Sequence, residues 1–527
     1  MDRMKCLLQV VDDDAKPLGT AGRIMPPRRI LALLSIAGAA LALALSAESG
    51  TSNPGPPLPE LTVSVDARHP GRAVTPRYLG LSFELSSAGV LASLADRGDL
   101  VGLLRSLGPG VLRLGGASAD TRVAWTDSRT PVPSWASAVL DRHVLRGIAR
   151  LAARSNWRVL LTLGLVHFDP RAAAREVAAA RSILGRWLAG IEIGNEPDSY
   201  ARHALRPAPW TPARYEAEVS AYRHAIARSA PGTPLAGPGV SGSRAFQRWG
   251  PAEARRQRPI LLTGHHYPLR CDAVPAPSIE DLLSGQTRAL EERSLGRFLS
   301  VSRKRAIGFR MDETNTVSCG GTPGISNTFA AALWAVGYIG RALAAGAVGV
   351  NLQGNPANCL GYSPLCATSP EQLSRGALRA QPQWYGLLLL SKLQGSRPLA
   401  THLLGSEPAD ISVTALRARD GGLRFAIADD EPVDAGPTLV RLMVGPGFDT
   451  GTVLTLAARS PAAVSGVTLG GRAVAGDGGW HPPPSLPRVP VSSGVLAVEL
   501  TPARAVLVTV APRRRVSLHG RSTSIHS

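Results

Sequence analysis

Several patterns that mark other classes of protein are absent from this sequence. Only five cysteines occur, with no CxxC pair and no His-Cys spacing that would suit a zinc ion. We find no nucleic-acid-binding motif and no internal repeat, and the basic residues are scattered along the chain. These absences argue against a zinc protein, a nucleic-acid-binding protein and a repeat protein. We therefore expect neither a metal ion nor an organic cofactor.

Acidic residues are scarce relative to basic ones. The 527 residues include 58 Lys and Arg against 39 Asp and Glu, which gives a formal net charge of +19. A compositional bias towards Arg is the simplest explanation of this excess. The alternative is attraction to an acidic glycan or another negatively charged partner.

Long hydrophobic runs are also rare, and the one clear case lies near the N-terminus. Residues 30–45 form an uncharged, mostly apolar run of 16 residues, shorter than the roughly 20 that a membrane-spanning helix needs. Arg28 and Arg29 precede the run, and small residues at a cleavage-type spacing follow it. We therefore predict a targeting segment over 1–47, favouring a cleaved signal peptide over an anchor, with Met25 as an alternative start.

The protein is accordingly expected to be secreted or extracytoplasmic, touching a membrane only if this segment stays uncleaved. The rest of the chain is long enough for two folded units. Residues 48–59 are a Pro/Gly/Ser-rich linker, and 60–400 alternate strand-like and helical patterns, as in a (β/α)8 barrel. Short alternating strands between Gly and Asp turns predict an all-β sandwich over 401–511, followed by a basic tail over 512–527.

The barrel prediction rests on eight apolar segments with helical patterns between them, such as 212–229 and 327–345. A further strand at 60–66 is not needed by the barrel and is free to pair into the sandwich. The eight segments are 79–85, 111–114, 159–165, 188–193, 235–239, 260–265, 306–311 and 348–352.

Two glutamates stand where strands of such a barrel end. Glu196 precedes Pro197 at the end of the fourth strand, and Glu313 closes the seventh. Closure of the barrel would bring both to one rim, where barrel enzymes carry their chemistry. Two carboxyl groups about 5–5.5 Å apart are what a retaining glycosidase needs. We predict Glu313 as the nucleophile and Glu196 as the acid/base.

Other polar residues at strand ends are candidate contacts to a sugar. Asn195 is placed to bond the sugar 2-hydroxyl, and Glu84 to bind other hydroxyls. Tyr267 is expected to hydrogen-bond the nucleophile, with His265 beside it on the polar rim, and Gln353 ends the eighth strand.

For three charged residues inside the strands, the sequence leaves open which way the side chain points. Arg113 could orient a rim carboxylate or merely pair in the interior. Glu192 and Asp312 are out of phase with the rim pattern, so one of them is expected to face the helices or a salt bridge.

Four cysteines remain after the targeting segment, an even number that is consistent with disulfides in an exported chain. They allow three pairings. Cys359 and Cys366 close a short loop and are the first choice, which leaves Cys271 with Cys319.

Together these segments resemble the retaining barrel glycosidases with acids on strands four and seven, and within them glycoside hydrolase family 79, the β-glucuronidases and heparanases. The resemblance covers about residues 60–510 and implies Glu196 as acid/base and Glu313 as nucleophile. The matching stretches are 79–84 (LGLSFE), 112–116 (LRLGG), 193–198 (IGNEPD), 265–267 (HHY), 313–315 (ETN), 383–387 (QWYGL), 467–471 (VTLGG) and 477–480 (DGGW).

One loop departs from that family. Such glucuronidases hold the substrate carboxylate with a Tyr and backbone amides in loops after strands seven and eight. Here the loop after the nucleophile has no Tyr, and Gly320, Gly321 and Tyr362 are the nearest candidates.

The sequence therefore predicts an exported retaining β-glycosidase acting on a carbohydrate, with β-glucuronides favoured. One alternative is the same chemistry on a neutral sugar, as in an arabinofuranosidase or xylosidase. Another is a non-catalytic carbohydrate-binding envelope protein on a glycosidase scaffold.

Overall fold

A computed structural model describes residues 58–129, 131–405 and 410–513 of the chain. The targeting segment, most of the linker and nearly all of the basic tail lie outside these residues. Within the described ranges, no helix combines the length and apolar character that crossing a membrane requires.

Eight parallel strands close into a barrel, so the predicted fold class is confirmed. The strands are almost wholly buried because helices cover their outer side and side chains fill the centre. Around the barrel they are β2 (Leu79–Glu84), β3 (Val111–Gly115), β6 (Arg158–Leu163), β7 (Leu188–Ile193), β8 (Leu235–Val240), β9 (Leu261–His266), β10 (Gly308–Thr314) and β11 (Gly349–Gly354).

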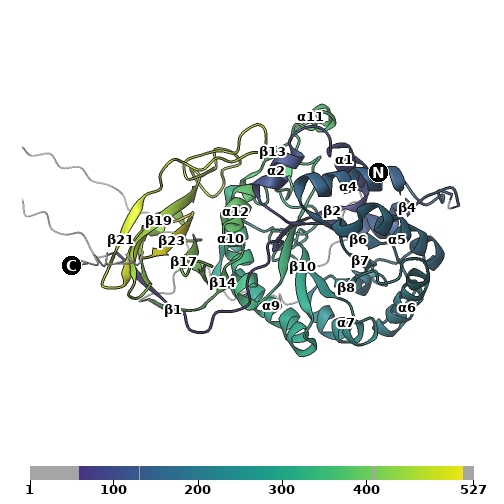
Figure 1. Ribbon diagram of the computed structural model, residues 1–527, viewed down its shortest axis with the longest axis horizontal. Helices are drawn as coiled ribbons and strands as arrows, with labels where there is room; N and C mark the ends of the chain where they lie inside the picture. Colours follow the sequence, from purple (N-terminus) through teal and green to yellow (C-terminus); the bar gives the residue numbers. More distant parts are fainter. Residues whose placement is uncertain (1–57, 130, 406–409, 514–527) are drawn as a thin grey trace, which may run out of the picture.

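Helices alternate with these strands and surround them (Figure 1). Local capping fixes several of their ends: Asp141 accepts a hydrogen bond from the Val144 amide at the start of one helix. The helices are α1 (Ala88–Ser93), α2 (Leu100–Ser106), α3 (Ala117–Thr121), α4 (Arg142–Ser155), α5 (Pro170–Leu184), α6 (Pro212–Ser229), α7 (Ser243–Arg256), α8 (Ile279–Leu283), α9 (Gly285–Arg305), α10 (Phe329–Ala345), α11 (Pro370–Arg375) and α12 (Pro382–Ser391). Two short ribbons join β4 (Val123–Trp125) to β5 (Ala138–Leu140), and β12 (Leu365–Cys366) to β13 (Arg379–Ala380).

The remaining strands form a second, all-β domain with its own hydrophobic core. Its strands are β1 (Glu60–Asp66), β14 (Arg397–Pro398), β15 (Ala400–Gly405), β16 (Ile411–Arg417), β17 (Leu423–Asp429), β18 (Thr438–Met443), β19 (Phe448–Ala457), β20 (Thr468–Leu469), β21 (Arg488–Ser492), β22 (Val495–Leu500) and β23 (Arg504–Pro512).

Two features of this domain refine the predicted boundaries. Strand β1 pairs antiparallel with β15 and parallel with β18, so the first described strand belongs to the C-terminal domain. Strand β14 pairs with β16, so this domain begins at Arg397 rather than at residue 401. The short connection after α12 leaves no room for a separate linker.

Helix α10 lies between the barrel and the sheet domain (Figure 1) and is buried almost all round. Two glycines allow the close approach. A Cβ at Gly340 would lie 2.3 Å from Thr414 Oγ1, and one at Gly337 would lie 3.1 Å from Ser412 Oγ. Both partners are on β16, so the fit of α10 against this strand joins the two domains.

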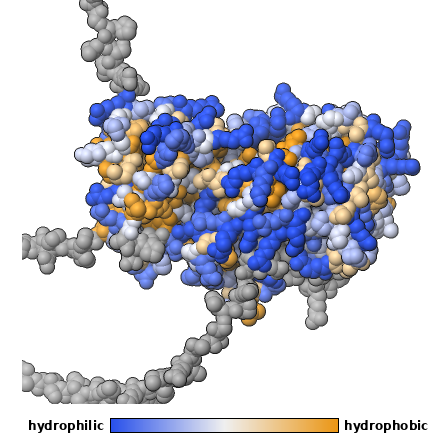
Figure 2. Space-filling model, turned by 90° about the horizontal axis from the view of Figure 1, so that it is seen from below, coloured by the Kyte–Doolittle hydropathy of each residue, from blue (hydrophilic) through white to orange (hydrophobic). Residues whose placement is uncertain are grey.

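The surface reflects the composition. Seen from below, hydrophilic residues cover much of the barrel, whereas hydrophobic residues gather over the sheet domain (Figure 2). In that domain Leu404 is 66% exposed and Leu403 is 45% exposed. Arginines occur on many of the helices, among them α4, α7 and α9.

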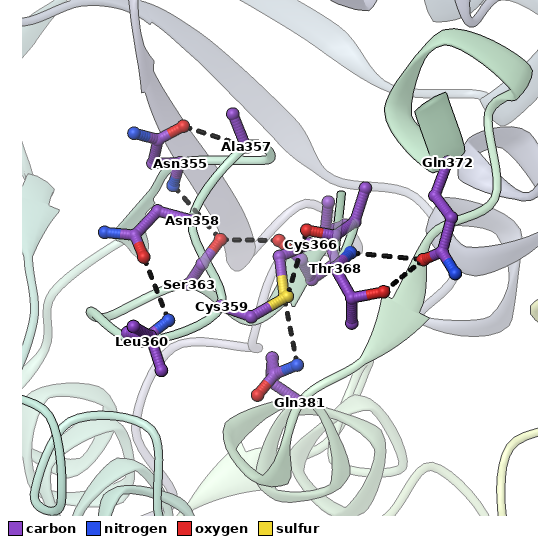
Figure 3. The surroundings of a disulfide bond; sticks show 12 residues. Asn355, Ala357, Asn358, Cys359, Leu360, Ser363, Cys366, Thr368, Gln372 and Gln381 are labelled. Atoms are coloured by element: carbon purple, nitrogen blue, oxygen red, sulfur yellow. Dashed lines mark hydrogen bonds between the residues drawn. A yellow bond between two sulfur atoms is a disulfide. The ribbon is translucent and has the colours of Figure 1, made fainter. Parts of the chain in front are cut away.

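The four cysteines after the N-terminal segment form two disulfides. Cys271–Cys319 joins the loops after β9 and β10 across 48 residues, and Cys359–Cys366 closes a loop of 7 after β11. The Gln381 side-chain amide donates to Cys366 Sγ (Figure 3). Both bridges therefore brace loops at the carboxyl end of the barrel.

We expect removal of either bridge to lower the free energy of unfolding by about 2–4 kcal/mol, because the unfolded chain gains freedom. The longer Cys271–Cys319 loop should give the larger loss. Urea unfolding of the two paired Cys→Ser variants measures both. Unchanged midpoints, or unchanged melting of the wild type under reductant, would count against the bridges.

Candidate active site

A sharp turn at the end of β7 carries Glu196. Gly194 has a φ of 80° and Glu196 itself a φ of 49°, which is uncommon for a residue with a side chain. The Glu196 amide donates to the Gly239 carbonyl oxygen over 2.8 Å. The turn therefore ends the strand and holds the Glu196 backbone against β8.

An irregularity in β10 carries Glu313. The register of β10 shifts against β9 between Met311 and Glu313, and against β11 between Met311 and Thr314. An extra residue in a strand disturbs the alternation of side chains between its two faces. Asp312 and Glu313 consequently both point to the barrel interior, although they are neighbours in sequence.

The two predicted acids meet at the carboxyl end of the barrel. A carboxylate oxygen of Glu196 lies within 4.8 Å of one of Glu313, and each residue is only 2% exposed. His265 bridges them: its Nδ1 lies 2.9 Å from Glu196 Oε1 and 3.9 Å from Glu313 Oε2. Glu196 Oε2 has no hydrogen-bond partner among the described residues. One oxygen of the acid is thus held and the other is left for a ligand.

Arg113 lies beneath the acids and is fully buried. Its Nη1 donates to Glu313 Oε2 over 2.7 Å, and its Nη2 to Glu192 Oε2 over 2.8 Å. Its Nε lies 3.0 Å from Asp312 Oδ2. A buried guanidinium with several acids is stable only because each donor is matched. Arg113 therefore does both things foreseen for it, pairing in the interior and orienting a rim carboxylate.

The two rim acids have opposite proton affinities. Burial raises the pKa of Glu196 to about 7, against the opposing hydrogen bond from His265. Burial also disfavours ionised Glu313, but the charges of His265 and Arg113 outweigh it and hold the pKa of Glu313 below its usual range. At neutral pH the site thus contains one carboxylate and one acid that retains much of its proton.

Glu192 and Asp312, deeper in the barrel, also have pKa values shifted in opposite directions. Despite burial, the guanidinium of Arg113 lowers the pKa of Glu192 to about 2. Burial and the Glu192 carboxylate raise the pKa of Asp312 well above its usual range. Burial alone would lower the pKa of His265, yet the nearby Glu313 carboxylate is the main cause that raises it to about 9. Two cations then face two anions, and the network is close to neutral.

Of the two alternatives for Glu192 and Asp312, the helices or a salt bridge, the structure shows the salt bridge: both residues pair with Arg113. Glu192 accepts hydrogen bonds from Thr162 and Thr263 inside the barrel, and Asp312 contacts Arg113 there. His265 was predicted as a substrate contact. It is completely buried and lies among carboxyl groups, 2.9 Å from Glu196 and 3.7 Å from Asp312.

Tyr267 donates a hydrogen bond to Glu313 Oε1 over 2.9 Å. The ring of Tyr362 stacks on that of Tyr267 with centroids 5.7 Å apart, and their hydroxyl oxygens lie 3.3 Å apart. The nucleophile candidate is thus held from one side by a tyrosine and from the other by Arg113.

The two candidate glycines shape the loop that carries Tyr362. The Gly320 carbonyl accepts from the Tyr362 amide, and the Gly321 amide donates to the Ser318 carbonyl. A Cβ at Gly321 would lie 2.4 Å from the Tyr362 nitrogen, and its φ is 89°. The Gly321 amide is therefore already used and does not present itself to a substrate.

Three further predicted residues surround the acids. Asn195 Oδ1 accepts from Arg113 Nη2 over 2.9 Å. Glu84 accepts from the Ser118 amide, and a Cβ at Gly116 would lie 2.4 Å from its Oε1, so only glycine fits there. Gln353 is buried, and its Oε1 has no hydrogen-bond partner among the described residues.

One supporting residue was missed from the sequence. Asp120 Oδ2 accepts from the Asn195 amide over 2.9 Å and from the Tyr200 hydroxyl over 2.7 Å, and its Oδ1 accepts from the Leu165 amide. It ties together the ends of β6 and β7. Its place in the short helix α3, after the Gly115-Gly116 pair, was the available signal.

Two trios of these residues have metal-like spacing: Glu192, His265 and Asp312, and Glu196, His265 and Glu313. Both share His265, which is protonated at neutral pH given its pKa of about 9. Arg113 also neutralises the same acids. The donor set therefore fits a balanced ion network better than a cation site.

No protein-family model matches the chain. A β-glucuronidase from Aspergillus niger is 28% identical over 181 residues, which cover 30% of the chain and 33% of that enzyme. The match thus spans about a third of the length of the curated relative.

Solved structures resemble the chain over most of its length. A 4-O-α-L-rhamnosyl-β-D-glucuronidase from Fusarium oxysporum has a TM-score of 0.67 at 17% identity and covers 85% of the chain and 100% of itself. A family 51 α-L-arabinofuranosidase from Bifidobacterium longum has a TM-score of 0.63 at 14% identity, with 86% and 99% covered. At such identities the likeness shows the shared fold.

Proposed function

We propose that this chain is an exported, retaining β-glycoside hydrolase that acts on β-glucuronides. The observation that carries the proposal is the pair of rim carboxyl groups, within 4.8 Å of each other and with pKa values shifted in opposite directions. A retaining glycosidase needs such a pair, one ionised to attack and one protonated to assist departure. The similarity to a β-glucuronidase supports the reaction class.

In the first step a Glu313 oxygen attacks the anomeric carbon while the bond to the leaving oxygen breaks. Glu196 gives its proton to that oxygen, and its unpartnered Oε2 is the atom suited to this. Arg113 and Tyr267 keep Glu313 ionised and fix its direction. The Nδ2 group of Asn195 is available to the sugar 2-hydroxyl, since its Oδ1 is held by Arg113.

In the second step water must lose a proton and attack the same carbon. Formation of the ester removes the negative charge of Glu313, which is one cause of the raised pKa of Glu196. The proton affinity of Glu196 then falls, and it accepts the proton of water as that oxygen bonds to carbon and Glu313 leaves.

Two candidate sugars differ in the group at C5, a carboxylate in a glucuronide and an uncharged group in a neutral glycoside. The choice of a glucuronide is supported by the similarity to a β-glucuronidase and by the Tyr362 hydroxyl, which lies 3.3 Å from that of Tyr267 beside Glu313. The second candidate is a retaining glycosidase of a neutral sugar. It is favoured by the Gly321 amide, which is bonded to Ser318 rather than open to an anion.

The test is hydrolysis of aryl β-glucuronide beside aryl arabinofuranoside, xyloside and glucoside, with the anomer of the product followed by NMR. Glucuronide turnover with retained configuration supports the proposal. Turnover of a neutral glycoside alone moves the specificity to the second candidate, and turnover of none favours a non-catalytic binding protein.

Glu196→Gln should lower kcat/KM by about 10²–10⁴-fold for glycosides with poor leaving groups, the usual contribution of a general acid. The kcat/KM for dinitrophenyl glycosides should fall far less, because their leaving group needs no proton. Wild-type kcat/KM should fall above pH 7 as Glu196 deprotonates, given its pKa of about 7.

In the variant this alkaline decline should disappear with the dinitrophenyl substrate. The pH profiles of kcat/KM with an alkyl and a dinitrophenyl glycoside provide the measurement. Equal losses on both substrates would defeat the assignment of Glu196.

A further inference from the structure

A pocket of about 600 Å³ lies beside the two rim acids rather than over them. Residues of β4 and of the start of α5 line it. Six of its residues matter here: Trp125, Trp135, His167, Phe168, Glu176 and Tyr222. The loops that form it follow β3 and β6, so it opens at the same carboxyl end of the barrel as the candidate active site.

Aromatic rings line one part of this pocket. Trp135 lies flat on the His167 ring, with centroids 3.7 Å apart and planes 8° apart, which fixes its orientation. Phe168 is 43% exposed and packs against Tyr222 with centroids 5.5 Å apart. Phe168 is exposed and Trp135 is half-buried, and oriented rings beside a hollow are suited to the apolar face of a flat ligand.

A carboxyl group without a partner lies on another side of the pocket. Glu176, on α5, is only 7% exposed, and no hydrogen bond to it is found among the described residues. Burial raises its pKa to about 8, so the group is largely protonated at neutral pH and can both donate and accept. Its carboxyl oxygens are not among the fully enclosed side-chain atoms that lack a partner, so a ligand in the pocket can reach them.

The pocket adjoins the candidate active site through Asp120. This residue lines the pocket, and its carboxylate holds the Asn195 amide next to Glu196. The side chain of Asp120 therefore contacts both the pocket and the backbone next to Glu196. Neither acid lines the pocket, so a glycan that reached both sites would pass over the contact between Asp120 and Asn195.

We propose that this pocket binds a neutral sugar unit of a longer glycan, stacked on Trp135 and hydrogen-bonded to Glu176, while another unit occupies the site of Glu196 and Glu313. The inference rests on the proposed glycosidase function and adds that the preferred substrate is an oligosaccharide. A sugar ring has an apolar C–H face that can stack on Trp135 and hydroxyl groups on its edge that can bond to Glu176.

A neutral unit fits better than a charged one. Asp120 and Asp169 line the pocket together with Arg129 and Arg175, so acidic and basic charges offset each other there. The protonated carboxyl of Glu176 adds no charge, and hydroxyl groups match its mixed donor and acceptor character.

The test is binding of cellotetraose, xylotetraose and tetragalacturonate by calorimetry to the full chain in the Glu313→Gln background, which prevents cleavage. Trp135→Ala should raise the Kd of at least one neutral tetrasaccharide about tenfold, the order expected for a lost stacking contact. The matched control is Trp187→Ala. That residue ends the short 3-10 helix Gly185–Trp187 before β7, at the opposite end of the barrel, and should leave Kd unchanged.

Glu176→Leu separates binding from folding. The variant should weaken the same tetrasaccharide several-fold while melting at an equal or higher temperature. The folded pKa of Glu176 is raised from 4.5 to about 8, so its ionisation opposes folding increasingly as pH rises between those values, and leucine removes that penalty. A merely structural role would instead lower the melting temperature.

Failure of the pocket and failure of the proposed function give different results. No neutral tetrasaccharide bound at millimolar concentration, an unchanged Kd in both variants, or binding of tetragalacturonate alone would overturn the inference. Aryl glycoside turnover by the control variant Trp187→Ala in the active background should match the wild type. Tetrasaccharide binding that depends on Trp135 in a chain without any turnover would support the pocket and overturn the catalytic proposal.

Discussion

Glu313→Gln should reduce glycoside turnover by at least about 10⁴-fold, the scale seen when a catalytic nucleophile is lost. The amide cannot form the glycosyl-enzyme, because its oxygen lacks the charge that attacks the anomeric carbon. It retains an acceptor for Tyr267 and much of the shape of the acid. Single-turnover kinetics with an aryl glycoside would show whether the first chemical step is lost.

A matched control for this change is Glu371→Gln on the exposed first turn of α11, which should leave turnover unchanged. Glu313→Ala with added azide gives a second readout. Azide would bond to the anomeric carbon as the aryl group leaves, yielding a glycosyl azide of inverted configuration. Residual activity of Glu313→Gln near the wild-type level would show that another group attacks the sugar.

Arg113→Met should lower the free energy of unfolding by about 3–5 kcal/mol, the usual cost of removing one partner from a buried ion pair. The change keeps an unbranched, flexible stem but leaves Glu192 and Glu313 without their guanidinium. Their folded pKa values would rise, so the variant would bind more protons when folded. Urea unfolding across pH is the measurement.

The sign of the pH dependence follows from Glu192. In the wild type its pKa is lowered from 4.5 to about 2, so its ionisation adds stability above pH 4.5 that is lost as pH falls towards 2. The deficit of Arg113→Met should therefore be largest above pH 5 and narrow in acid.

Arg310→Met is the control, because that buried arginine donates to Asn351 and to backbone carbonyls rather than to a carboxylate. Arg310→Met should lower the free energy of unfolding by less than Arg113→Met does, and that deficit should change little with pH. A deficit in Arg113→Met that does not vary with pH would contradict the ion-network interpretation.

The sequence was sufficient to locate the eight barrel strands and the two rim acids because both depend on local patterns. Apolar runs mark the strands, and Pro197 marks the end of β7. The orientation of Asp312 could not be read, since it depends on a shift in the register of β10. The role of Asp120 was hidden for a similar reason: its partners at Leu165 and Asn195 are 45 and 75 residues away.

The surroundings of His265 could also not be predicted from its own strand. Its place after an apolar strand predicted a polar rim residue, and that much followed from alternation. Its enclosure by three carboxyl groups depends on β7, β9 and β10 meeting inside the barrel. A pattern within one strand carries no information on which charges its neighbours contribute.

The pairing of β1 has a consequence for the order of folding. This strand precedes the whole barrel in the chain, yet its partners β15 and β18 follow the barrel. During synthesis the first described strand must wait, unpaired, until more than three hundred residues have emerged. The sheet domain can close only after the barrel exists, and pairings so distant in sequence are slow to form. A chain begun at Leu79 would retain every barrel strand but release an open sheet edge able to join another copy.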